Sequence, residues 1–147
     1  MKNTTNKVAW FVFAFLAIGV GLYPLLYVFV DGKIALLASK SDELLADVFW
    51  NIGFYGHILP GGIALLTGWV QFSKKMRSRN LNLHRNLGKV YVIAAVISGI
   101  CGFYIAFNAT GGLITTLGFM SLAIIWLFTT SKAYLAIRKG DIQLHQG

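Results

Sequence analysis

Long uncharged runs on either side of a basic segment constrain the fold of this chain more than any other feature. Residues 8–30 contain no charged side chain, and neither does the 42-residue run 90–131. Between them, residues 73–91 carry six Lys or Arg and no acid. A helix needs about 20 apolar residues to cross the ~30 Å hydrocarbon layer of a bilayer. The runs therefore predict a chain that crosses a membrane several times.

The composition supports a lipid environment rather than an aqueous one. Of the 147 residues, 56% are hydrophobic and only 12% are charged, and the mean hydropathy is +0.67. A formal net charge of +8 in a soluble protein would indicate nucleic-acid binding, but here apolar runs separate the bases. We therefore expect a lipid bilayer as partner and no nucleic acid. The length predicts a single membrane domain over residues 1–147.

The hydropathy pattern predicts an all-α transmembrane bundle of four helices. The expected spans are approximately residues 8–30, 48–72, 88–108 and 113–138. A turn-forming cluster at residues 108–112 divides the last long run into two spans. After Gly140, Asp141 resembles the cap of a fifth helix that has only begun when the chain ends.

Several residues predict how these helices begin and bend. Ser39 or Ser41 can cap a helix that starts on the outer surface and runs straight into the second span. The third helix can be capped by Asn80 or Asn82. Proline interrupts the backbone hydrogen bonds of a helix. We therefore expect kinks where prolines fall in the first and second spans, at Pro24 and Pro60.

The distribution of basic residues predicts the orientation. With four spans, eleven Lys and Arg fall on one side of the membrane, and only Lys33 and Lys40 fall on the other. The positive-inside rule then places both the N-terminus and the C-terminus in the cytoplasm. The basic loop between the second and third spans is expected to contact anionic lipid headgroups there.

A face of small residues predicts how the third span packs. Ala94, Ser98, Gly102 and Ala106 recur at intervals of four residues, which places them on one side of a helix. In lipid, small residues allow close backbone approach, which drives helix association. We expect this face to pack within the bundle rather than to form a homodimer seam.

His57 is the leading candidate functional residue because an ionisable side chain is costly inside a span. Gly53 and Gly61 lie four residues to either side of it on the same helical face. Such positions leave room for a flat macrocycle, so His57 is a candidate axial ligand of haem b. The simpler alternative is an imidazole hydrogen-bonded to a carbonyl that Pro60 frees.

The other two histidines are predicted to lie near the cytoplasmic surface. His84 lies near the start of the third helix with Gly88 one turn later, and His145 follows the fourth span. His84 and His145 are therefore at similar depth and are further candidate iron ligands, whereas His57 has no histidine partner. No cysteine or embedded carboxylate accompanies them, which disfavours zinc. No nucleotide-binding, dithiol or zinc-protease motif is present, so no catalytic residue is assigned.

Three segments together carry a family resemblance. His57-Ile58 is followed by GGIALLTGWVQF at residues 61–72, LHRNLGKVYV occupies residues 83–92, and GDIQLH occupies residues 140–145. In this order and spacing they resemble a bacterial multi-pass membrane family catalogued as a domain of unknown function, number twenty-three zero six. The resemblance implies an inner-membrane protein of uncharacterised activity. It also implies a C-terminal truncation, because members continue past the last histidine into further spans.

Three function classes remain open. The first is a non-enzymatic membrane protein with a structural, sensing or permeation role, because embedded polar groups are few. The second is a b-type haem electron carrier or oxidoreductase subunit. Residues 83–88, Leu-His-Arg-Asn-Leu-Gly, resemble the start of the third helix in di-haem transmembrane cytochromes and ferric reductases, which supports it. The third is a quinone or lipid-like ligand site near Trp50, Tyr55 and His57.

Overall fold

The described part of the chain is all-helical. The computed structural model describes residues 2–141, and these contain helices, turns and loops but no strand. The predicted start of a fifth helix after Asp141, and His145 with it, lie outside the described residues. The all-α prediction is confirmed for the described residues.

The first predicted span is a helix whose geometry changes near its C-terminal end. α1 (Lys2–Leu22) passes into the 3₁₀ helix η1 (Tyr23–Leu25) and then into the short helix α2 (Leu26–Phe29). Pro24 lies inside η1, where its missing N–H removes an α-helical hydrogen bond. The helix is therefore locally tightened at this proline, whereas the predicted kink stays a prediction.

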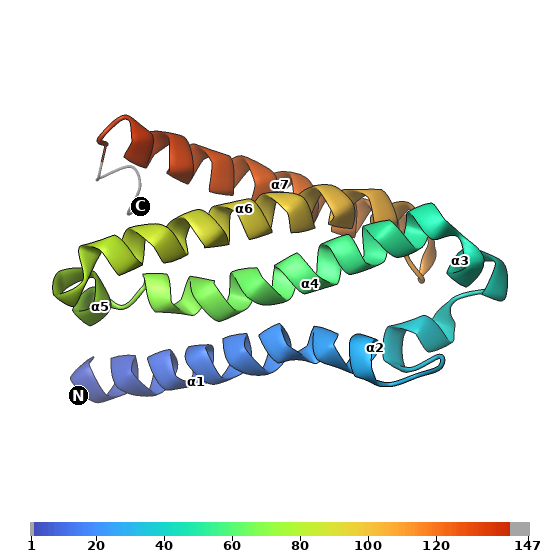
Figure 1. The fold of residues 1–147 in the computed structure, drawn as a ribbon, viewed down its shortest axis with the longest axis horizontal. Coiled ribbons are helices and arrows are strands. Elements are labelled where there is room, and N and C mark those ends of the chain that lie inside the picture. The colour runs from blue at the N-terminus through green and yellow to red at the C-terminus, as the bar shows by residue number, and fades with distance from the viewer. Residues whose placement is uncertain (1, 142–147) are drawn as a thin grey trace.

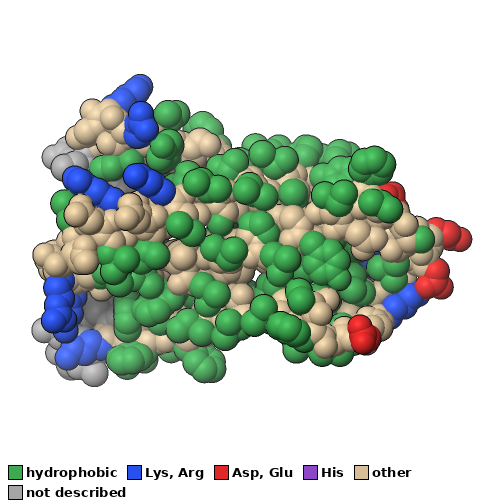
Figure 2. All heavy atoms as spheres, viewed as in Figure 1, with side chains coloured by type: hydrophobic (Ala, Val, Ile, Leu, Met, Phe, Trp, Pro, Cys, Tyr) green, Lys and Arg blue, Asp and Glu red, His purple; other side chains and the backbone are tan. Residues whose placement is uncertain are grey.

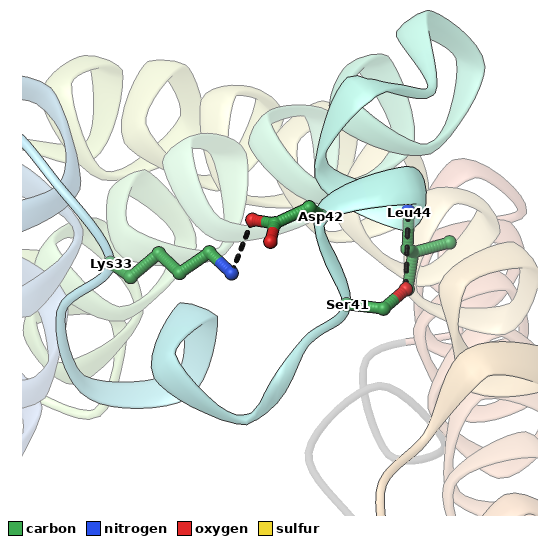
Figure 3. A network of polar contacts seen from close by, with 4 residues as sticks. All are labelled: Lys33, Ser41, Asp42 and Leu44. Atoms are coloured by element: carbon green, nitrogen blue, oxygen red, sulfur yellow. Dashed lines mark hydrogen bonds and ion pairs between the residues drawn. The ribbon is translucent and has the colours of Figure 1, made fainter.

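The connection between α2 and α4 contains two short helices, η2 (Ala35–Ser39) and α3 (Asp42–Ala46). The Ser41 hydroxyl caps α3 by accepting a hydrogen bond from the Leu44 N–H at 3.3 Å, and Lys33 forms an ion pair with Asp42 (Figure 3). The expectation that this helix runs straight into the second span is wrong. Asp47 ends α3, and its carboxylate accepts hydrogen bonds from the Phe49 and Trp50 N–H groups, which starts a new helix.

Three long helices follow. α4 (Val48–Gln71) continues as one helix through Pro60, and the basic segment after it forms the short helix α5 (Lys74–Arg79). α6 (Leu81–Ile105) is capped by Asn80, as predicted, and ends in the 3₁₀ helix η3 (Ala106–Asn108). α7 (Gly112–Arg138) begins after Gly111, whose φ of +114° is a conformation that glycine adopts readily.

The long helices pack side by side in the order α1, α4, α6, α7 (Figure 1). α4 contacts both α1 and α6, and its contact with α6 is the most extensive in the described chain. Large apolar side chains elsewhere point outward: Phe15 on α1 is 76% exposed and Ile114 on α7 is 87% exposed. Such a surface requires lipid or a partner to cover it.

Three helices of the described chain are long and apolar enough to cross a membrane. They are Lys7–Phe29, Leu81–Asn108 and Gly112–Arg138. α4, the predicted second span, is not among them, because it carries polar residues such as Asn51 and His57 and several glycines. A membrane protein with several apolar helices is thus supported, whereas four spans remain a prediction.

Charge is segregated to the two ends of the molecule. Figure 2 shows most of the visible Lys and Arg side chains at one end and the acidic side chains at the other, where basic side chains such as Lys33 also lie. The acidic end contains Asp31, Asp42, Glu43 and Asp47, and the long helices between the two ends are predominantly apolar.

Candidate functional site

Glycines on α4 bring it close to α6. A Cβ on Gly53 would lie 2.6 Å from Tyr104 Cδ1, and one on Gly61 would lie 3.0 Å from Ser98 Oγ. Real Cβ atoms essentially never approach as closely as the Gly53 distance, and the Gly61 distance is tighter than most, so glycine at both positions lets the two helices lie close together. Side chains of α6 thus occupy the space beside these two glycines, in which a macrocycle was expected.

The predicted small-residue face of α6 supplies the other half of this contact. Ala94, Ala95 and Ser98 are buried, and the two alanines form a cluster with Ala64 of α4. Packing within the chain, the expected role of this face, is therefore confirmed. The close approach also exposes backbone carbonyl groups of one helix to side chains of the other.

The His57 side chain forms a hydrogen bond with this exposed backbone. Its Nδ1 atom lies 2.9 Å from the carbonyl oxygen of Ser98 on α6, and the Ser98 hydroxyl donates to the His57 carbonyl oxygen at 2.8 Å. A Cβ on Gly102 would lie 2.6 Å from Nδ1, so that glycine leaves the space in which the ring sits. The expected hydrogen bond to a carbonyl is present, but the carbonyl belongs to Ser98 and not to the turn before Pro60.

This hydrogen bond determines the tautomer of the imidazole. A carbonyl oxygen can only accept, so Nδ1 must carry the proton and donate it to Ser98. In the Nδ1–H tautomer, Nε2 holds a lone pair, and no hydrogen-bond partner for it occurs among the described side chains. The His57 ring is thus fixed by one nitrogen and offers the other as an acceptor or metal ligand.

The His57 ring lines a large apolar cavity of about 710 Å³. Its walls come from α1, α4, α6 and α7 and from the connections at the acidic end of the molecule. This volume lies within the range of small-molecule sites, which are typically apolar with a few oriented polar groups. Most of the side chains that line the cavity are aliphatic or aromatic, and several lining residues are glycines. His57 and Ser98 are the polar residues of the wall where α4 meets α6.

Two tryptophans in the cavity wall have unpaired indole nitrogens. Nε1 of Trp50 and Nε1 of Trp126 are buried and have no hydrogen-bond partner in the described chain. Trp50 is only 2% exposed and stacks on Phe54 at a centroid distance of 5.2 Å. A buried N–H without an acceptor costs about 1–3 kcal/mol, so these two indole groups lower the stability of the packing around the cavity.

Lys40 lines the cavity at the acidic end of the molecule. Lys40 donates from Nζ to the carbonyl oxygen of Asn108 and, at 3.0 Å, to the hydroxyl of Thr110. These bonds join the connection before α3 to the turn between α6 and α7. Desolvation lowers the pKa of the Lys40 ammonium, while its two oxygen partners favour the charged form.

His84 and Gly88 take part in a separate cluster at the basic end. With the Gln71 amide oriented so that donors meet acceptors, its nitrogen lies 3.1 Å from His84 Nδ1, and its oxygen accepts from the Gly88 N–H at 3.2 Å. The cluster fastens the end of α4 to the start of α6. Because Nδ1 of His84 accepts here, its Nε2 carries the proton, the opposite tautomer to His57.

The structure separates the predicted histidines. His84 precedes Ser98, the partner of His57, by 14 residues on α6, or about 21 Å along the axis. His57 and His84 therefore belong to different sites. Whether His145 joins His84 lies outside the described residues.

Three residues of the site were not singled out for it from the sequence: Ser98, Lys40 and Trp126. Ser98 was recognised only as part of a small-residue face, although a hydroxyl at such a position often bonds across helices. Lys40 is one of only two bases on its side of the predicted membrane, which is a usable signal. Nothing in the local sequence distinguishes Trp126 from an ordinary apolar residue of the span.

Comparison with known protein families agrees with this architecture. The family described as "Predicted membrane protein (DUF2306)" matches residues 54–147. The chain belongs to this family. The matched DUF2306 region includes His57, Ser98 and the walls that α6 and α7 give to the cavity. No curated protein and no solved structure matches the chain.

Proposed function

We propose that this protein is a four-span membrane protein that binds an apolar molecule bearing a hydroxyl group in the cavity beside His57. It performs a sensing or permeation role in a bacterial inner membrane and is not an enzyme. The observation that carries the proposal is the lone pair of His57 Nε2 in the wall of a predominantly apolar cavity of about 710 Å³.

The position of α4 supports four spans, and with them a single membrane domain over residues 1–147. Its 24 residues give a helix of about 36 Å, which exceeds the ~30 Å hydrocarbon layer. It lies between α1 and α6, two helices that are apolar enough to cross. A helix with protein on both sides needs less apolar surface than one that faces lipid, which explains its polar residues.

The charge segregation supports the orientation. With the basic end in the cytoplasm, both termini are cytoplasmic and Lys40 and the acidic connection are outside. The basic end then faces the anionic headgroups of the inner leaflet, and the cavity lies in the outer half of the bilayer.

Cysteine labelling tests this orientation. In a Cys101→Ala background, we expect Glu43→Cys on α3 to react with a membrane-impermeant maleimide in intact cells. Ser78→Cys on α5 should react only after the cells are permeabilised. Both side chains are exposed, so accessibility to the reagent depends on the side of the membrane. Equal labelling of both cysteines in intact cells would contradict the topology.

The polar groups of the cavity specify a hydroxyl. An O–H donates to His57 Nε2, which a ketone, an ether or a hydrocarbon cannot do. Alkylphenols, quinols and long-chain alcohols share this chemistry, with an apolar body for the remaining walls.

Binding of a matched pair of ligands tests the proposal. The probes are 2-bromo-4-decylphenol and its methyl ether, which differ in one donor; bromine quenches nearby tryptophan fluorescence. We expect the native protein to bind the phenol about tenfold more tightly, the value of one hydrogen bond. His57→Leu should remove that preference, and His57→Gln should restore part of it.

The control for this test is Thr67→Ala on the same helix. The Thr67 hydroxyl bonds only to carbonyls of its own helix, at Ile63 and Ala64, and Thr67 is not in the cavity wall. The preference for the phenol should therefore survive. Equal affinity of the native protein for both probes, or no binding of either, would refute the proposal.

Haem b is the second candidate, and the tautomer of His57 favours it. An imidazole that donates Nδ1–H to a carbonyl presents Nε2 to iron in the usual way. The fit is partial, because the residues that line the cavity offer no second histidine and α6 fills the space at Gly53. A bound haem would supply one-electron transfer. A sharp α band in the reduced-minus-oxidised spectrum that His57→Ala abolishes would favour haem over the hydroxyl ligand.

A further inference from the structure

A second groove lies between α6 and α7 at the basic end of the molecule. It has a volume of about 360 Å³ and is distinct from the cavity beside His57. The two helices approach closely near mid-span, where a Cβ on Gly99 would lie 2.7 Å from Leu127 Cδ2, and they diverge toward the basic end (Figure 1). The groove occupies the space that this divergence opens, and these residues line it: Lys89, Val92, Ile93, Val96, Ile97 and Tyr134.

The groove is apolar along its length and basic at its end. Its aliphatic side chains come from α6, and Ile93 is 61% exposed to the surroundings. Lys89 stands at the end nearest the polar surface. On α7, Arg138 lies one turn after Tyr134, and its Nη1 is 3.5 Å from the hydroxyl of that lining residue. The lysine of α6 lines the groove, and the arginine of α7 is the neighbour of a residue that lines it.

We propose that this groove binds one anionic phospholipid of the cytoplasmic leaflet. An acyl chain lies along the aliphatic wall, and the phosphate lies between Lys89 and Arg138, where the Tyr134 hydroxyl can also donate to it. The leaflet assignment rests on the orientation proposed above, whereas the site itself does not. Charge complementarity decides the occupant: a hydrocarbon groove that ends in two bases matches an acidic headgroup above an acyl chain.

A specific lipid site must be distinguished from general electrostatic attraction of anionic lipid to the basic end of the molecule. It depends on the total charge at this end of the molecule, to which Lys75 and Arg77 of α5 contribute as much as the groove residues. A specific site depends on where the charges stand and on the aliphatic wall being open. These two requirements can be varied separately.

Native mass spectrometry of the purified protein in micelles tests the site. The micelles contain equal amounts of dioleoyl phosphatidylglycerol and dioleoyl phosphatidylcholine. We expect one retained phosphatidylglycerol and no retained phosphatidylcholine. Lys89→Gln combined with Arg138→Gln should lower the retained fraction by about fivefold for each charge removed. The matched control, Lys75→Gln with Arg77→Gln, removes the same charge outside the groove and should leave retention unchanged.

A third variant tests the aliphatic wall. Ile93→Trp fills the groove and leaves every charge in place, so it should also abolish retention. Retention of both lipids alike would mean annular lipid only and would overturn the site, as would equal losses in the two charge variants. Displacement of the lipid by inorganic phosphate would show that the acyl chain contributes nothing and would also overturn it. None of these outcomes depends on orientation, which the cysteine labelling tests, or on the ligand of the His57 cavity.

Discussion

Gly62→Ala should unfold at a lower temperature than the native protein and separate α1 from α4. A Cβ at this position would lie 2.6 Å from the backbone oxygen of Gly21 on α1 and 3.3 Å from Pro24 Cγ. A backbone oxygen cannot rotate out of the way as a long side chain can, so the whole helix must move. Overpacking of this kind costs about 1–3 kcal/mol.

Two measurements on this variant separate stability from helix contact. Thermal unfolding in detergent, followed by circular dichroism, gives the loss of stability. A cross-link of Trp10→Cys to Trp69→Cys by a short bis-maleimide reports the α1–α4 contact, because the two native rings touch at a centroid distance of 5.6 Å. The cross-link should form readily when Gly62 is retained and poorly when the Gly62→Ala substitution is added.

The matched control is Gly19→Ala on α1, where a Cβ would meet nothing within 4 Å. Alanine is favoured over glycine inside a helix by about 1 kcal/mol, so this variant should be unchanged or slightly more stable. Opposite signs for the two alanine variants are the expected result. Equal effects would mean that close backbone approach does not hold α1 in place.

Gly102→Ala should disrupt the candidate site and the α4–α6 contact together. The new Cβ would lie 2.6 Å from His57 Nδ1 and 2.9 Å from Cε1. The imidazole can then stay only if it leaves the Ser98 carbonyl. We expect a loss of about 2–3 kcal/mol, from the overpacking and from a buried hydrogen bond.

Nitrogen-15 spectra of histidine-labelled protein provide the decisive measurement on Gly102→Ala. The native protein should show His57 as the Nδ1–H tautomer, and the variant should show a mixed tautomer population. Gly118→Ala on α7, with nothing within 4 Å of the added Cβ, serves as the control and should keep the native spectrum. An unaltered His57 signal in Gly102→Ala would contradict the geometry described for this ring.

The parts of this fold that depend on local chemistry were predictable from the sequence. The expected second helix at residues 48–72 corresponds to Val48–Gln71, and the fourth at 113–138 corresponds to Gly112–Arg138. Runs of apolar residues and turn-forming residues determine these limits. The break between α3 and α4 at Asp47 was not predicted. An aspartate can lie inside a helix or cap the start of one, and the sequence alone does not show that Asp47 caps α4.

The parts of the site that depend on contacts between distant residues were not predictable. His57 was identified as important, but its partner Ser98 is 41 residues away, and a shift of one residue between α4 and α6 would pair it with another carbonyl. The Lys40 contact with Asn108 spans 68 residues. The cavity forms only where four helices are placed relative to one another, and the periodicity of apolar residues along each helix does not specify that placement.

The modest apolarity of α4 has a consequence for biosynthesis. Nascent segments partition into the bilayer one by one according to their hydrophobicity, and a segment with polar side chains partitions weakly on its own. For the four-span arrangement proposed above, we expect the glycines of α4 that face α6 to let the two helices enter the bilayer as a helical hairpin. We therefore expect α4 to be committed to its position only after the ribosome has delivered α6 to the insertion machinery.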